Sequence, residues 1–203
     1  NATGRTITVT VADEDGGSSI TTKSVTANNV APTAALSGAA TVAEAATYTL
    51  AVGAVSDPGP DTRSGYAIDW GDGSVQSLTA AEWAAAAGSF SHAYADGAMG
   101  GSARLISVSA TDEDGTHLLG TQAVTVQNAA PIVVPTGAAA TTEGASYVLD
   151  LVGSDPAGAA DTLSYSIDWG DGSAAQVLTA VQLAALGGSV AHVFADDDDG
   201  PLN

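Results

Sequence analysis

Acidic turns are the feature of this sequence with the clearest chemistry. The motif "DEDG" occurs at 13–16 and 112–115, where two aspartates lie two residues apart and a glycine can adopt a positive φ. Carboxylate oxygens in a tight turn are ligands that Ca²⁺ prefers. Neither copy is an EF-hand loop, because the twelfth position is Ser24 or Ala123 instead of a bidentate acid. A hairpin turn without an ion is the alternative, since Asp-Gly is a leading hairpin signal.

Two longer loops add further acids. "SDPGPDT" at 56–62 and "SDPAGAADT" at 154–162 each place two aspartates just before an expected strand. Ca²⁺ takes about six to eight oxygen ligands, so asparagines in neighbouring linkers could complete such a site. The sequence therefore predicts one or more Ca²⁺ sites, with Ca²⁺ as the cofactor, among Asp13, Asp15, Asp57, Asp61, Asp112, Asp114, Asp155, Asp161, Asn29 and Asn128.

Composition excludes several classes of function. The 203 residues carry 4 Lys and Arg against 23 Asp and Glu, a net charge of −19 that repels nucleic acid and anionic lipid. No cysteine is present, which rules out disulfides, thiolate zinc sites and a cysteine nucleophile. No apolar run reaches the roughly 18 residues of a membrane-spanning helix. We expect neither nucleic-acid binding nor membrane insertion.

The histidines and tryptophans fit a structural role. His92 and His192 recur in "HAY" and "HVF", and no serine, cysteine or acid arrangement of a nucleophilic site accompanies them in the sequence. Trp70 and Trp169 alternate with isoleucine and are expected in the core. His117, beside a DEDG turn, is expected to face solvent. We predict no catalytic residue and no enzyme activity.

These residues sit on a tandem repeat of 99 residues, which separates Trp70 from Trp169. The repeat predicts three pieces. Residues 1–28 match the last two strands of a repeat, residues 29–128 form a complete domain that we call the middle copy, and residues 129–203 form a third copy that lacks its last two strands.

Alternating apolar and polar residues, separated by Gly, Asp and Pro clusters, predict an all-β fold built of β-sandwiches. One segment of each copy differs, because 78–88 and 178–188 have helical composition. Thr79 with Glu82 and Thr179 with Gln182 fit capping boxes, and Gly88 and Gly187 fit C-terminal caps. We expect one short inserted helix in each sandwich, with a structural role.

The strand and turn "IDWGDGS", followed by "HAY" or "HVF" and then "ISVSATDEDG", resemble the PKD family of immunoglobulin-like domains. The "NVAP" and "NAAP" linkers and the "SDP…DWGDG" stretches are similar to those of large multi-repeat bacterial proteins. The resemblance implies tandem immunoglobulin-like (PKD-like) sandwiches in a secreted or cell-surface bacterial protein. It also implies a spacer, adhesive or carbohydrate-associated module.

Two functions remain open at this point. One is a structural or adhesive stalk module stiffened by calcium, and the other is a polysaccharide- or cell-surface-binding accessory module of a secreted enzyme. The mismatched ends favour association of copies head to tail, either by strand donation or as one continuous repeat polymer. Folding of residues 1–28 back onto 129–203 of the same chain is the competing arrangement.

Overall fold

The computed structural model describes residues 3–59 and 61–195. This part of the chain is mostly β, with several sheets and two short α-helices, as expected of an all-β protein. It divides into two compact units. Of the described residues, the first contains 3–42, 47–59, 61–92 and 103–125, and the second contains 43–46, 93–102 and 126–195. Among the described residues, no helix combines the length and apolarity needed to cross a membrane.

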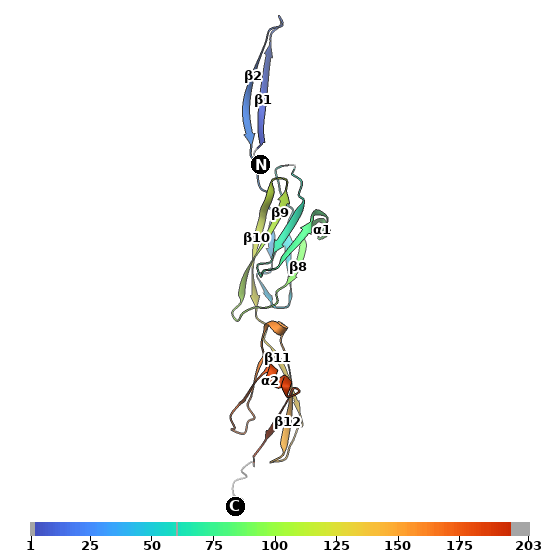
Figure 1. The fold of residues 1–203 in the computed structure, drawn as a ribbon, viewed down its shortest axis with the longest axis vertical. Helices are drawn as coiled ribbons and strands as arrows, with labels where there is room; N and C mark the ends of the chain where they lie inside the picture. Colours follow the sequence, from blue (N-terminus) through green and yellow to red (C-terminus); the bar gives the residue numbers. More distant parts are fainter. Residues whose placement is uncertain (1–2, 60, 196–203) are drawn as a thin grey trace, which may run out of the picture. The chain divides into compact units, whose positions relative to one another are not determined.

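The N-terminal strands form an antiparallel hairpin. β1 (Thr3–Ala12) pairs with β2 (Ser18–Ala27) along its whole length, from Thr3 opposite Ala27 to Ala12 opposite Ser18 (Figure 1). Every residue of both strands is exposed. One face of β1 is nevertheless apolar, with Ile7, Val9 and Val11 between 51% and 64% exposed.

The middle copy contains two sheets. A five-stranded sheet has the order β4-β10-β9-β6-β7, and a three-stranded sheet has the order β3-β5-β8. Strand burial alternates as the sequence predicts, and Leu50, Ile68 and Val108 are fully buried. The bounds are β3 (Leu36–Gly38), β4 (Thr41–Ala43), β5 (Thr47–Val52), β6 (Gly65–Asp69), β7 (Val75–Thr79), β8 (Ser89–Ala93), β9 (Ser102–Asp112) and β10 (Gly115–Gln127).

The third copy has a smaller core. Leu151, Leu183 and Val190 are buried, whereas Ile167 and Trp169 are only partly buried. Their middle-copy counterparts, Ile68 and Trp70, are 0% and 2% exposed. The sheets have the orders β11-β12-β15 and β13-β14. The elements are β11 (Ile132–Gly137), β12 (Ser146–Ser154), the 3₁₀ turn η1 (Gly158–Ala160), β13 (Ser164–Ile167), β14 (Gln176–Thr179) and β15 (Ser189–Val193).

Both predicted helices are present, as α1 (Ala80–Ala85) and α2 (Ala180–Ala185), and each begins with the predicted capping box. Trp83 of α1 stacks on Tyr66 with ring centroids 4.0 Å apart, so this helix packs on β6. Gly187 takes the left-handed position that ends α2, with φ of 72°. The prediction of Gly88 for α1 is off by one residue, because Ala87 directly follows the C-cap Ala86 and already has φ of 50°.

Candidate metal centre

Three predicted ligands come together in the first unit. Asp57, Asp61 and Asp112 each offer a carboxylate oxygen, and the three oxygens lie within 4.8 Å of one another. Asp57 and Asp61 belong to the loop between β5 and β6, and Asp112 is the last residue of β9. All three offer oxygen only, which suits a hard divalent cation such as Ca²⁺.

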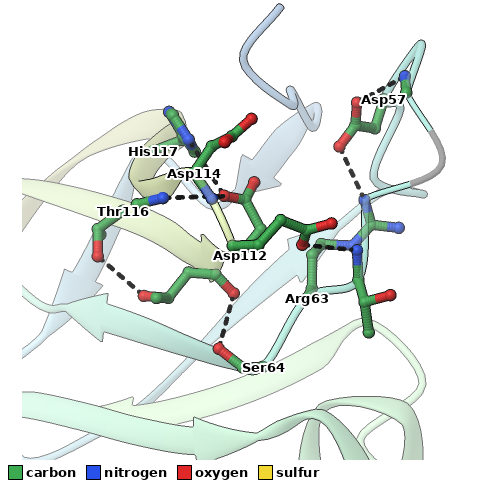
Figure 2. Close-up of polar contacts among 12 residues, drawn as sticks. Asp57, Arg63, Ser64, Asp112, Asp114, Thr116 and His117 are labelled. Atoms are coloured by element: carbon green, nitrogen blue, oxygen red, sulfur yellow. Dashed lines mark hydrogen bonds and ion pairs between the residues drawn. The ribbon is translucent and has the colours of Figure 1, made fainter. Parts of the chain in front are cut away.

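The DEDG turn fixes one oxygen of Asp112. Its Oδ1 accepts hydrogen bonds from the backbone N–H of Asp114 at 2.8 Å and of Gly115 at 3.1 Å (Figure 2). Its Oδ2 is buried and has no hydrogen-bond partner, and the residue as a whole is 7% exposed. A buried carboxylate oxygen without a partner is costly unless a cation compensates it.

A hydrogen bond ties the β5–β6 loop to this turn, and further contacts hold the loop itself. The backbone N–H of Thr62 donates to Oε2 of Glu113 at 3.0 Å. Oδ1 of Asp57 accepts from the N–H of Gly59 at 3.0 Å, and its Oδ2 lies 3.4 Å from the Arg63 guanidinium (Figure 2). Arg63 therefore neutralises part of the negative charge that the aspartates gather.

The negative charge that Arg63 leaves uncompensated affects the pKa of Asp61. Partial burial, followed by the carboxylates of Asp57 and Glu113, raises the pKa of Asp61 above its ordinary value. Asp114 and Asp112 add to the same effect. The pKa is raised because the charged form is disfavoured, and a bound cation would reverse that preference.

A second acidic cluster lies in the second unit and consists of Glu44, Asp155 and Asp161. Glu44 is 2% exposed, and its two oxygens accept the N–H groups of Ala129 and Gly97, each at 2.8 Å. Partial burial, then Glu44, Asp155 and Asp96, raise the pKa of Asp161. Residues 126–195 contain no lysine or arginine, and the 99-residue shift puts Thr162 at the position of Arg63.

Sequence reasoning missed Glu44. The available signal was its recurrence, because Glu44 and Glu143 are 99 residues apart and the chain has only five glutamates, whereas aspartates fill most of its turns. Only the folded chain brings Glu44 next to acids that follow it by more than 100 residues.

Of the other predicted ligands, Asp13, Asp15 and Asp114 belong to neither carboxylate cluster in the described part of the chain. The remaining two, Asn29 and Asn128, offer amide oxygens instead of carboxylates. The first DEDG motif forms the β1–β2 hairpin turn, where Oδ1 of Asp13 accepts the N–H groups of Asp15 and Gly17. The Asn128 amide donates to the carbonyl of Ala129. These five assignments stay predictions.

His117 does not face solvent as the sequence suggested. Its side chain is 21% exposed, and its Nε2 is buried without a hydrogen-bond partner, 3.4 Å from Oδ1 of Asp112. The short connection between β9 and β10 places this histidine beside the acid that begins the turn (Figure 2).

The recurring histidines each contact an aspartate and a tryptophan. Nε2 of His92 lies 2.7 Å from Oδ2 of Asp72, and the ring stacks on Trp70. Burial alone would raise the pKa of Asp72, but hydrogen bonds from Ser74 and His92 outweigh it and lower the pKa to about 2.

The third copy repeats this arrangement. Nε2 of His192 lies 2.7 Å from Oδ2 of Asp171, and its ring stacks on Trp169. Hydrogen bonds from Ser173 and His192 lower the pKa of Asp171.

The His92 pair differs from a nucleophilic triad. Oγ of Ser74 lies 3.4 Å from the same Nε2 that faces Asp72, whereas a triad uses the two ring nitrogens for serine and aspartate separately. The hydroxyl of Ser74 also donates to Asp72. The contacts therefore form a polar network around the "WGDG" turn.

No protein-family model matches this chain, and a search of curated proteins finds no match either.

Proposed function

We propose that this chain is a non-catalytic structural or adhesive repeat module, built of PKD-like domains and stiffened by Ca²⁺, in a secreted or cell-surface bacterial protein. The buried, unpaired Oδ2 of Asp112 carries the proposal, because it belongs to a cluster of three carboxylates. Bound Ca²⁺ would tie the β5–β6 loop to the β9–β10 turn and supply the missing partner.

Several contacts support a structural role. The His–Asp–Trp network occurs in both copies with the same 2.7 Å distance, as expected of a device that holds a turn. Glu44 ties the backbone at Ala129, within the predicted linker, to the backbone at Gly97. In such a module the copies associate head to tail, and the acidic clusters restrict movement of the loops.

A polysaccharide-binding module would need exposed aromatic platforms. Among the described residues, the strongly exposed large hydrophobic side chains are aliphatic or methionine. Trp83 of α1 is partly buried and stacks on Tyr66, and the centroid of its ring lies 4.7 Å from that of Phe90. The structural module is therefore the better supported of the two functions.

The test is a calorimetric titration of CaCl₂ into chelator-treated protein. We expect saturable heat for the unmodified chain and loss of one binding event in Asp112→Asn. The Asn side chain keeps one oxygen to accept the N–H groups of the turn, but its amide nitrogen takes the place of Oδ2, the carboxylate oxygen without a hydrogen-bond partner. The matched control is Asp69→Asn, which changes an exposed turn aspartate of the same copy whose Oδ1 also accepts a backbone N–H; it belongs to neither cluster and should leave the heat unchanged.

Absence of binding heat in the unmodified chain would overturn the calcium assignment. An equal loss of binding heat in Asp112→Asn and Asp69→Asn would show that calcium does not bind at the Asp57, Asp61 and Asp112 cluster. Asp161→Asn tests the second cluster in the same way. Circular dichroism of each variant is the control for folding.

A further inference from the structure

One basic residue lies against the first acidic cluster, the group of Asp57, Asp61 and Asp112. We propose that Arg63 is an internal counter-ion of this cluster, which compensates Asp57 in the calcium-free protein and lowers calcium affinity by competing for that carboxylate. The inference rests on the proposed function, because it concerns the same calcium site. It adds the residue that sets the affinity of the site and the direction of its effect.

The contact between Arg63 and Asp57 is a loose ion pair. Nη1 of the guanidinium lies 3.4 Å from Oδ2 of Asp57, within the same loop (Figure 2). Charge-assisted hydrogen bonds between these groups are about 2.7–2.9 Å long at their strongest, and the best arginine–carboxylate pairs use two nitrogens of the fork. The Nε of Arg63 is directed to Tyr66 instead. A divalent cation can therefore displace this pair.

A second anchor holds Arg63 independently of Asp57. Its Nε donates to the hydroxyl oxygen of Tyr66 at 3.2 Å, and the Tyr66 ring stacks on Trp83 of α1. Tyr66 is held in β6, which pairs with both β7 and β9. Loss of the contact with Asp57 would therefore leave the guanidinium tethered close to the cluster.

Burial strengthens the effect of this charge. The side chain of Asp57 is 4% exposed and that of Arg63 is 25% exposed. Charges shielded from water interact more strongly than exposed charges, and dissolved salt screens them less. Arg63, one of only four lysines and arginines in the chain, is therefore placed where its charge counts most for the cluster.

The competition concerns one oxygen of Asp57. Its Oδ1 accepts the backbone N–H of Gly59 at 3.0 Å, whereas its Oδ2 faces Arg63. A Ca²⁺ ion that coordinates Oδ2 either replaces the guanidinium or shares the oxygen with it. In both cases a fixed positive charge opposes the entry of a dication, so Arg63 weakens calcium binding.

The calcium-free protein benefits from the same charge. Partial burial, followed by the carboxylates of Asp57 and Glu113, raises the pKa of Asp61, so the acids repel one another even beside Arg63. Removing Arg63 would increase this repulsion. One charge thus stabilises the protein without calcium and disfavours calcium binding.

Calorimetric titration of CaCl₂ into chelator-treated protein measures the competition, for the binding event that Asp112→Asn removes. We expect Arg63→Gln to bind calcium about 10-fold more tightly than the unmodified chain, which is the smallest effect that a unit charge within about 4–6 Å typically has on an ionisation equilibrium. Arg63→Lys retains the positive charge and should bind calcium less tightly than Arg63→Gln.

Arg104→Gln is the matched control for the change in net charge. Arg104 lies on β9 about 26 Å from Asp112 along the strand, at about 3.3 Å per residue. This distance exceeds the Debye length of about 8 Å at physiological ionic strength. Loss of the charge of Arg104 should therefore leave the calcium affinity unchanged.

Thermal melting tests the opposite effects of Arg63 with and without calcium. In excess EGTA, Arg63→Gln should melt at a lower temperature than the unmodified chain. Millimolar CaCl₂ should then raise the melting temperature of Arg63→Gln by more than that of the unmodified chain, because the variant binds calcium more tightly. An arginine with a merely structural role would lower both melting temperatures equally.

Failure of this inference is distinguishable from failure of the calcium site. Saturable heat in the unmodified chain, with equal or weaker binding by Arg63→Gln, would overturn the role of Arg63 and leave the site intact. Equal tightening in Arg104→Gln or Arg63→Lys, or an equal lowering of both melting temperatures, would also overturn it. Absence of binding heat in the unmodified chain would overturn the calcium site and the role of Arg63 together.

Discussion

Glu44 and Asp112 are the two buried acids among the described residues, and their hydrogen bonding differs. Both oxygens of Glu44 accept backbone N–H groups, so its charge is compensated within the protein. Asp112 has two N–H partners on Oδ1 and none on Oδ2. Glu44 therefore acts first as a backbone tie, while Asp112 is the acid that gains most from an added cation.

Replacing Glu44 by Gln tests this tie. The amide nitrogen of Gln would oppose a backbone N–H at Gly97 or Ala129, leaving buried donors unpaired. We expect Glu44→Gln to lower the free energy of unfolding by about 1–3 kcal/mol, measured by urea denaturation. The repeat provides a control, because Glu143→Gln changes an exposed residue and should cost less than about 0.5 kcal/mol. Equal effects of the two variants would contradict the role given to Glu44.

The Asp72–His92 pair makes a prediction about pH. The pKa of Asp72 falls from 3.8 to about 2 on folding, so its ionised form stabilises the protein above about pH 4. This contribution is lost as the pH falls from about 4 to about 2. Asp72→Asn should cost about 1 kcal/mol at pH 7, because water screens this partly exposed pair, and progressively less below pH 4. The measurement is the free energy of unfolding of the unmodified chain and of Asp72→Asn across this pH range. A difference between the two proteins that stays constant with pH would refute the prediction.

At the scale of elements, the helix caps give a direct test. Oγ1 of Thr79 accepts the N–H of Glu82, and the Glu82 carboxylate accepts the N–H of Thr79. Thr79→Ala should therefore lower the free energy of unfolding by about 1 kcal/mol, whereas Thr79→Ser should retain the cap. Calcium binding should be unchanged in both, because α1 contributes no ligand to either cluster. Weakened calcium binding without loss of stability would give the helix a part in the site.

The elements that sequence predicts well are those fixed by local chemistry. Apolar alternation indicates the strands, the capping boxes locate both helices, and Asp-Gly marks the turns after Ala12 and Asp112. Ala87 shows the limit, because the helix adopts its left-handed residue one position before the available glycine. Which residue ends a helix depends on packing of the following strand as well as on local preference.

The candidate site was only partly predictable, because it also depends on contacts that local sequence does not determine. The loop spacing placed Asp57 and Asp61 near the strand that follows them, and the repeat connected Asp112 with Asp13. Which carboxylate oxygen lacks a partner depends on geometry that spacing does not determine. His117 lies beside Asp112 because of the tight turn between β9 and β10. Glu44 meets Asp155 and Asp161 because folding brings together segments that are distant in sequence.

At the scale of the whole molecule, the three pieces of the repeat differ in how much apolar surface their described residues bury. The middle copy buries Ile106 and Val108 on its own β9, whereas the hairpin exposes their counterparts and the third copy leaves a groove. Burial of apolar surface drives both folding and association. In the proposed module, bound calcium would stiffen the loops at the ends of the strands.

Thermal unfolding with and without calcium tests the central claim most directly. The chain is melted in excess EGTA and again in millimolar CaCl₂ at fixed protein concentration and ionic strength, followed by calorimetry. At calcium about 100-fold above its dissociation constant, the account predicts stabilisation of about 2.7 kcal/mol per site and a melting temperature several degrees higher. Coincident scans would contradict a calcium-stiffened module.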